Sequence, residues 1–299
     1  LDGDNLGGWL RGENSPKVRE VMHPDLVRYY EGLGAHTKGG LDAKRPVGPA
    51  LHAAISTALT NFALHVVPDV VAEHHGTVIY SGGDDTLALL PVSTVLACAR
   101  KLQQIYTTPD WHTHNGREYL MMGSRATLSG GIVVVHAVDD LRLALQDARR
   151  AEHHAKEAGR DALAITVRRR SGEHTSAVCP WTFVETVQQW VDAFCKRASD
   201  RWAYHLAAEK ETLSGLDADA VRAVVRQQVN QAETFTRRLL GEPERPKDGE
   251  KAGDILASQF EEYRKLVMNP ERNFDLSRTV NNFLTLCQSA SFLAPGRDE

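Results

Sequence analysis

The chain of 299 residues has the composition of a globular protein, with 42% hydrophobic and 25% charged residues. A formal net charge of only −4 excludes a protein that binds nucleic acid through bulk positive charge, so any nucleotide site is expected to be local. The four cysteines form no CxxC pair, which argues against a zinc cluster or a disulfide framework. No apolar run is predicted to reach the roughly 20 residues that span a bilayer, and we expect a cytoplasmic protein without membrane contact.

The N-terminal residues predict the end of a strand that runs into a turn, with Asp2 and Asp4 near the tip. Leu1 already lies inside this motif, so we expect the chain to be part of a longer protein. Residues 11–45 are rich in Gly, Pro and charge, and they predict a long loop with little regular structure. Loops of that length are usually functional or mobile.

From residue 49 onward, apolar residues predict alternating helices and strands. In chain order these are a helix over 49–74, strands near 76–81 and 85–90, a helix near 93–107, a strand near 126–136, a helix over 140–158 and a strand over 162–167. Pro68 is expected to kink or break the first helix. Residues 108–125 predict a polar loop, and Asp139 and Gly159 are expected to cap the helix between them. The order of strands and helices predicts an α+β, ferredoxin-like fold, the arrangement of polymerase-type palms.

The palm region is predicted over 1–180, and beyond it apolar residues keep helical spacing. Residues 181–299 therefore predict a separate all-helical domain. Helices are expected near 253–268 and 275–292. A charged connector containing Pro and Gly is expected over 241–252.

The turn Gly82-Gly83-Asp84-Asp85 is the most informative segment of the chain. It places two carboxylates at a hairpin tip with little side-chain bulk, and the predicted topology brings Asp2 and Asp4 beside them. Carboxylates gathered at one point stay ionised together only when a cation neutralises them. Mg²⁺ or Mn²⁺ does this and keeps sites open for phosphate oxygens. Two such ions about 3.5–4 Å apart would activate a hydroxyl and stabilise a leaving pyrophosphate. An ordinary turn is the alternative.

Two basic groups of residues also invite a functional interpretation. Lys156 and Arg160 are four residues apart, so they share one side of a helix end and could bind a triphosphate. Solvated surface charges are the plainer interpretation. Arg168, Arg169 and Arg170 could contact RNA phosphates. For these three residues a solvated strand end is the favoured interpretation.

These segments together resemble a known family. The acidic hairpin, the Lys156-to-Arg160 helix end and the strand order resemble the palm shared with GGDEF-type diguanylate cyclases. A closer resemblance, over residues 1–170, is to the large polymerase-like subunit of type III CRISPR effector complexes of the Cmr (III-B) subtype. Its characteristic segments are matched by Asp2-Gly3-Asp4-Asn5-Leu6-Gly7, by residues 45–52 and by residues 79–85.

The resemblance implies an activity and a set of partners. Such subunits convert ATP into cyclic oligoadenylates when their complex binds target RNA, so it implies a metal-dependent nucleotidyltransferase. Its partners would be ATP, the other subunits, and guide and target RNA bound through the complex. Because the reaction joins two nucleotides, turnover is expected to require a dimer or a second palm.

The resemblance also implies roles for individual residues. Asp84 and Asp85 would be catalytic; metal would be held by Asp2, Asp84, Asp85 and, as a further candidate, Asp4; nucleotide would lie against Ser81, Gly82, Gly83, His52, Lys156 and Arg160. Asp85 stands where diguanylate cyclases have Glu, which argues against that activity. A GGDEF-like cyclase or palm polymerase using other nucleotides stays open, as does a non-catalytic ATP-binding scaffold.

Overall fold

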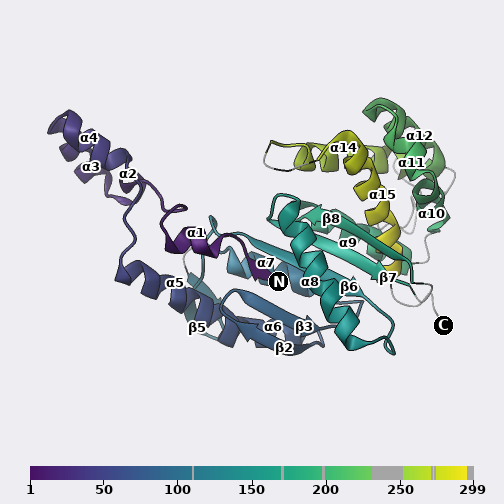
Figure 1. The fold of residues 1–299 in the computed structure, drawn as a ribbon, viewed down its shortest axis with the longest axis horizontal. Coiled ribbons are helices and arrows are strands. Elements are labelled where there is room, and N and C mark those ends of the chain that lie inside the picture. The colour runs from purple at the N-terminus through teal and green to yellow at the C-terminus, as the bar shows by residue number, and fades with distance from the viewer. Residues whose placement is uncertain are drawn as a thin grey trace.

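The structure, a computed structural model, describes residues 1–109, 111–169, 172–196, 199–230, 252–270, 272 and 274–294. Within these ranges the fold is α+β, as the sequence predicts. A sheet lies at the centre, helix α8 (Leu141–Glu157) crosses the face turned to the viewer in Figure 1, and the C-terminal helices gather at the upper right. The N-terminus lies in the middle of the molecule, beside the sheet (Figure 1).

The main sheet has four strands in the order β1 (Asp2–Gly3), β6 (Leu128–Val134), β7 (Ala162–Arg168) and β8 (His174–Pro180). Strand β6 is antiparallel to β1 and parallel to β7, and β8 is antiparallel to β7. The hairpin of β2 (Thr77–Gly82) and β3 (Asp85–Leu89) adjoins β1, because Leu1 and Thr86 exchange two backbone hydrogen bonds of 2.9 and 2.8 Å. The order β2, β3, β1, β6 is the predicted ferredoxin-like order.

The predicted helix over 49–74 is interrupted at Pro68, as expected. It consists of α5 (Pro49–Asn61), a π-helical turn η1 (Phe62–Val66) and α6 (Val67–Glu73). In the π turn the Val67 N–H donates to the Phe62 carbonyl. Pro68 has no N–H, so the Ala63 carbonyl is left without a helical donor. The Ser81 hydroxyl of β2 donates to that carbonyl at 3.0 Å, which ties the hairpin to the helix.

The run Pro49–Glu73 meets the length and composition of a membrane-crossing helix, with a mean hydropathy of 1.3 in its apolar window. From the sequence, no apolar segment was expected to meet this test. Phe62, Val66 and Val70 of this run are buried in a core that also contains residues of α7 (Val95–Tyr106). A core helix passes the same length test, so this run is weak evidence for a membrane span.

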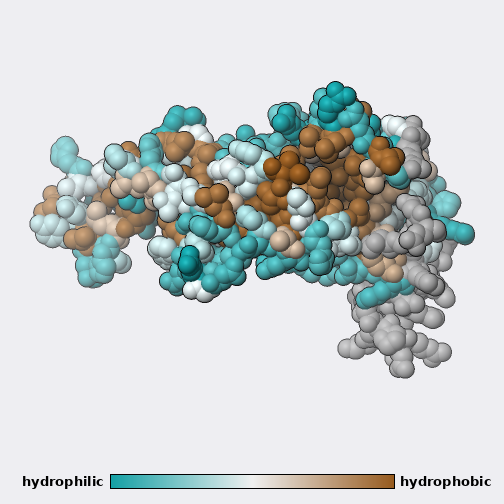
Figure 2. All heavy atoms as spheres, turned by 90° about the horizontal axis from the view of Figure 1, so that it is seen from below, coloured by the Kyte–Doolittle hydropathy of each residue, from teal (hydrophilic) through white to brown (hydrophobic). Residues whose placement is uncertain are grey.

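Residues 11–45 are helical where the sequence predicts a long loop. After α1 (Leu6–Leu10), an arm at the upper left of Figure 1 is formed by α2 (Val18–Val21), α3 (Pro24–Gly32) and α4 (Ala35–Asp42). Pro24 takes the first position of α3, where its fixed φ favours a helix start. In these three helices only Leu41 is buried, so the sequence carries little sign of a buried face. Figure 2 shows apolar side chains among hydrophilic ones at this end.

Residues 108–125 are not a polar loop as predicted. They contain an antiparallel hairpin of β4 (Trp111–His114) and β5 (Arg117–Leu120). Asn115 and Gly116 at its turn have positive φ angles of 49° and 73°, as a two-residue type I′ turn requires. The Asn-Gly pair was therefore the local signal for this hairpin.

The boundaries of α8 follow the prediction closely. Its N-cap is Asp140 rather than the predicted Asp139, because the Asp140 carboxylate accepts a hydrogen bond of 2.8 Å from the Arg142 N–H. Gly159 ends the helix with a φ of +101°, as predicted for a left-handed cap. Strand β8 was not predicted, although it completes the sheet.

The C-terminal part is helical, as expected. Its described helices are α9 (Val184–Cys195), α10 (Arg201–Ala208), α11 (Lys210–Ser214), α12 (Ala218–Asn230), α14 (Ala252–Val267) and α15 (Leu276–Leu293). Most of the predicted connector over 241–252 lies outside the described residues. Tyr263 donates to the Val178 carbonyl and Asn282 accepts from the Val178 N–H, both at 2.8 Å, so these helices cover the outer edge of β8. The core is continuous across residue 180, and a domain boundary there stays a prediction.

Candidate functional site

The acidic hairpin turn is formed as the sequence predicts. Gly82 pairs with Asp85, so Gly83 and Asp84 are the two turn residues. Of these two, only Gly83 has a positive φ, +64°, which is the pattern of a type II′ turn. Space around the Gly83 Cα is open, so a ligand could approach the backbone there. The turn presents Asp84 at the edge of the sheet beside β1.

Asp2 and Asp84 meet at this edge. Their carboxyl groups lie within hydrogen-bonding reach of each other. Burial raises the pKa of the Asp84 carboxyl above its ordinary value, and the negative charge of Asp2 raises it further. Gly3 permits the contact, since a Cβ at this residue would lie 2.8 Å from the Asp84 Cβ and 2.7 Å from the Tyr106 hydroxyl. The predicted approach of carboxylates from separate segments is therefore present for this pair.

Lys156 reaches the pair from the last turn of α8. Its ammonium donates to the Asp2 carboxylate and forms a second ion pair, of 2.7 Å, with Glu152 Oε1. Burial lowers the pKa of Lys156, but the hydrogen bonds to Asp2 and Glu152 outweigh it and raise that pKa overall. Lys156 is thus a cation of the acidic pair itself rather than a solvated surface charge.

Asp85 and Arg160 are exposed. Asp85 is exposed at the start of β3, and its charge contributes to the raised pKa of Asp84. Arg160 is exposed, with a φ of +62° directly after the helix-ending glycine. Among the described contacts, none involves the Arg160 side chain. A guanidinium in this position is open to an anionic ligand.

The described hydrogen bonds of Asp4 are made to the fold rather than to Asp2, Asp84 or Lys156. Both of its oxygens are occupied, by the Thr127 and Ser129 hydroxyls at 2.8 Å each and by the Asp161 N–H at 3.1 Å. The residue is only 4% exposed. Its carboxylate therefore holds β1, β6 and the turn after α8 together, and a metal-binding role for Asp4 stays a prediction.

Two of the expected nucleotide-binding side chains also have other partners. The Ser81 hydroxyl donates to the Ala63 carbonyl, on the helix side of the hairpin. His52, exposed on α5, is 3.0 Å from the Leu10 carbonyl through Nε2. These contacts give both side chains structural roles, and none of their described contacts is with Asp2, Asp84 or Lys156.

The donor set is compatible with a divalent cation, although it is incomplete in this arrangement. Among the described residues, no group of three or more His, Cys, Asp or Glu side chains is arranged to hold a metal ion. The Asp2–Asp84 pair nevertheless has the chemistry of a hard-cation site, since the negative charge of Asp2 helps to raise the pKa of Asp84, and a cation would relieve that repulsion. Lys156 is the cation that the chain itself supplies.

Two residues at the site were not identified from the sequence. Glu152 stands four residues before Lys156, a spacing that predicts an ion pair on one helix face and was available as a signal. Tyr106, 2% exposed at the end of α7, places its hydroxyl beneath Gly3 and next to Asp84. Burial raises the pKa of its phenol, so the hydroxyl stays protonated. No sequence pattern distinguishes this tyrosine from other core aromatics.

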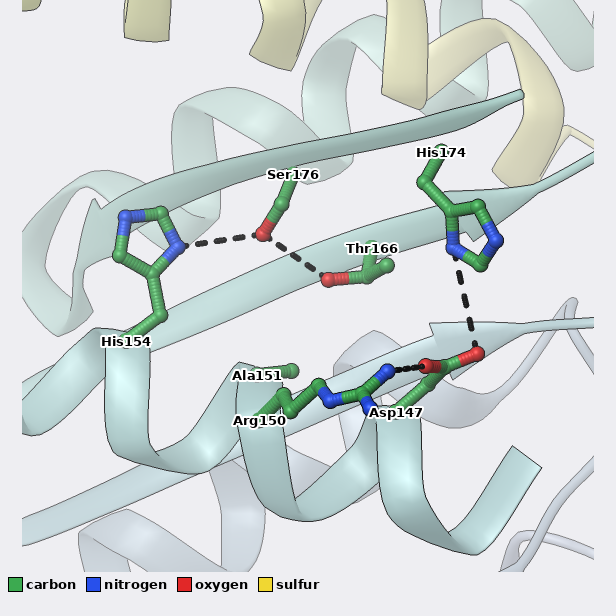
Figure 3. Close-up of a pocket in the computed structure, with 7 residues that line it drawn as sticks. All are labelled: Asp147, Arg150, Ala151, His154, Thr166, His174 and Ser176. Atoms are coloured by element: carbon green, nitrogen blue, oxygen red, sulfur yellow. Dashed lines mark hydrogen bonds and ion pairs between the residues drawn. The ribbon is translucent and has the colours of Figure 1, made fainter. Parts of the chain in front are cut away.

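Away from the acidic pair, a hollow of about 400 Å³ lies between α8 and strands β7 and β8 (Figure 3). Its polar groups satisfy one another: Asp147 pairs with Arg150 at 3.0 Å and with Arg168 at 3.3 Å, and His154 lies 3.1 Å from the Ser176 hydroxyl. Arg169 pairs in turn with Glu173 at 2.6 Å, and Arg170 lies outside the described residues. The two described arginines at this strand end are thus internally paired.

The comparisons with known proteins agree with this geometry. The fold and the paired carboxylates define a palm of the cyclase and polymerase type. Residues 1–164 match the family model described as Cas10/Cmr2, second palm domain. Since this match covers more than half of the chain, the protein belongs to the Cas10/Cmr2 family and is a Cmr2-like subunit.

Two curated relatives and two solved structures illustrate the relationship. The chain is 32% identical to Cmr2 of Pyrococcus furiosus over 222 residues, which is 71% of this chain and 23% of the relative. It is 45% identical over 60 residues to Cmr2 of Saccharolobus solfataricus, 20% of this chain and 6% of the relative. The chain therefore spans about a quarter or less of the length of these relatives.

Cryo-EM structures of type III-B Cmr-beta share the fold. The one bound to cognate target RNA matches with a TM-score of 0.50 at 20% identity, over 66% of this chain and 23% of that chain. The apo state matches with a TM-score of 0.53 at 17% identity, over 88% and 28%. At these identities the likeness establishes the fold alone.

Proposed function

We propose that this chain is the nucleotidyltransferase palm of a type III-B CRISPR antiviral complex and makes cyclic oligoadenylates from ATP with Mg²⁺ or Mn²⁺. The observation that carries the proposal is the convergence of Asp2, Asp84 and Lys156 from three separate elements. A turn that served only to reverse the chain would gain nothing from placing a half-buried carboxylate against another one.

In this proposal the carboxylates hold the metal ions and the basic side chains bind the phosphates. Asp2 and Asp84, with Asp85 beside them, would hold two divalent ions, which would activate the attacking hydroxyl and neutralise the leaving group. Arg160, exposed after the end of α8, and Lys156 would bind the triphosphate, and the open backbone at Gly83 would allow a phosphate to come close. The 3′-hydroxyl oxygen of one ATP attacks the α-phosphorus of the next, its proton is lost, and the bond to pyrophosphate breaks.

The partners are proposed from the relatives. One matched structure is of type III-B Cmr-beta bound to cognate target RNA, and we propose that this chain acts within such a complex in the cytoplasm. Guide and target RNA would be bound through the complex. A single palm positions one nucleotide, so turnover would need a dimer or a second palm to supply the other.

The test offers radiolabelled ATP and GTP separately to the assembled complex, with Mn²⁺ and target RNA, and separates products by chromatography. Cyclic products from ATP are expected, and the double variant Asp84→Ala, Asp85→Ala is expected to make none. Products from GTP would instead favour a GGDEF-like cyclase or a polymerase. Binding of ATP without any product, in a complex shown to contain target RNA, would overturn the proposal in favour of a scaffold.

A further inference from the structure

Lys156 is held between two carboxylates. Its ammonium contacts Asp2 on one side and Glu152 on the other, and the exposed fractions of the three side chains are 23%, 31% and 21%. Glu152 and Lys156 stand one helical turn apart on α8, whereas Asp2 belongs to β1. The lysine therefore has one anchor on its own helix and one across the site.

The ammonium contacts a carboxylate that is proposed to hold a divalent ion. In the arrangement described, Lys156 compensates the charge of Asp2 while Asp2 touches Asp84. An ion bound to the Asp2 carboxylate would repel the ammonium a few ångströms away, because like charges at that separation interact strongly where water is partly excluded. Lys156 and a divalent ion are thus competitors for Asp2.

Glu152 determines where the displaced ammonium goes. Its Oε1 atom is buried, and the pair with Lys156 is the one contact described for that atom. A buried carboxylate oxygen without a cation is costly, so Glu152 retains the lysine at the site after the contact with Asp2 is lost. The N–H group of the ammonium that donated to Asp2 is then free to donate to a phosphate oxygen, while another stays with Glu152.

We propose that Glu152 is a positioning residue that holds Lys156 when a divalent ion takes its place at Asp2, so that one lysine serves as counter-ion in the metal-free site and as phosphate ligand in the loaded one. This inference rests on the proposed function and deepens it. Glu152 acts only through Lys156 and does not itself hold the ion.

The test measures Mn²⁺ binding to the full chain without nucleotide, from the electron paramagnetic resonance signal of free Mn²⁺. Lys156→Met removes the competitor and is expected to lower the Kd about fivefold, the upper end for a partly exposed ion pair. Lys156→Arg keeps a competing cation and is expected to retain the wild-type Kd. Glu152→Gln leaves the ammonium wholly to Asp2 and is expected to raise the Kd about threefold.

The double variant Glu152→Gln, Lys156→Met separates positioning from direct ligation. A Kd within about twofold of that of Lys156→Met supports the inference, since Glu152 then has nothing to position. A much higher Kd would make Glu152 a ligand of the ion and overturn it. Glu157→Gln is the matched control, because it removes a carboxylate that pairs with His153 on the same helix end at 3.3 Å.

Asp84→Asn distinguishes failure of this inference from failure of the proposed function. If Asp84→Asn leaves Mn²⁺ affinity unchanged, the ion does not bind at the acidic pair and both proposals fall. If it weakens binding while Lys156→Met has no effect, only the role of Lys156 and Glu152 falls. Circular dichroism checks that each variant folds, and Lys156→Gln replaces Lys156→Met should the latter not fold.

Discussion

Two carboxylates of one short motif, Asp2 and Asp4, lie in opposite environments. Asp4 is buried and accepts hydrogen bonds from three neutral donors, which use most of the acceptor capacity of its oxygens. Asp2 is partly exposed and faces another carboxyl group and an ammonium. A carboxylate saturated by neutral donors stabilises the fold, whereas one opposed to a like charge is poised for a cation. The motif thus combines Asp4, which stabilises the fold, with Asp2, which is placed to bind a cation.

The largest expected effect is on ATP turnover and concerns Asp84, the carboxyl group that faces Asp2. Asp84→Asn should lower ATP turnover of the complex by more than about a hundredfold, because replacing groups that merely support metal ligands already costs 10- to 100-fold. The free energy of unfolding of the ion-free protein should stay equal or rise, since the repulsion with Asp2 is relieved. Product assays and urea unfolding of the same preparation measure both. If Asp84→Asn lowers both stability and activity strongly, Asp84 stabilises the fold as Asp4 does, and the difference between the two residues disappears.

On the structural side, Asp4→Ala should lower the free energy of unfolding by about 3 kcal/mol. The change leaves the Thr127 and Ser129 hydroxyls and the Asp161 N–H without their acceptor inside the protein. Urea unfolding measures the loss. Mn²⁺ affinity of the fraction that stays folded should be unchanged, and a specific loss of ion binding without a loss of stability would restore Asp4 as a metal ligand.

The sequence predicted the parts of the site that local rules govern. Gly83 followed by Asp84 is a turn by its own backbone preferences, and the strand order places that turn beside Asp2. The hydrogen bonds of Asp4 depend on Thr127 and Ser129, which lie more than a hundred residues along the chain and reach it through the β1–β6 pairing. No local pattern contains that information.

Ser81 shows a second limit of the same kind. Alternation along a strand predicts that Ser81 and its neighbours point to opposite faces, but it does not tell which face carries the helix. The orphaned carbonyl at Ala63 arises from the π turn before Pro68, and only the tertiary structure brings it to β2. The hairpin of β4 and β5 is a different case, because a local signal for it was present. The Asn115-Gly116 pair predicts a hairpin turn, but the polar composition of residues 108–125 favoured a loop instead.

A smaller effect tests this assignment of Ser81. Ser81→Ala should cost about 1 kcal/mol in urea unfolding, because the Ala63 carbonyl loses its donor. The KM for ATP should not change, since the hydroxyl is turned toward the helix. An increase in the KM for ATP with unchanged stability would mean that Ser81 contacts the nucleotide and does not stabilise the hairpin.

The smallest expected effect is a pH dependence that belongs to Asp84. Its pKa in the folded protein is raised by burial and by Asp2, so between the ordinary and the raised pKa the folded state binds more protons than the unfolded state. The free energy of unfolding contributed by this group therefore increases as the pH falls through the raised pKa and levels off below the ordinary value. Urea unfolding of ion-free protein across this window should show that slope, and Asp84→Asn should lack it. Mn²⁺ binds the ionised carboxylate, so saturating Mn²⁺ should abolish the slope in this window in the wild type, because the folded and unfolded states then both lack the proton. An unchanged slope would mean that the ion binds elsewhere.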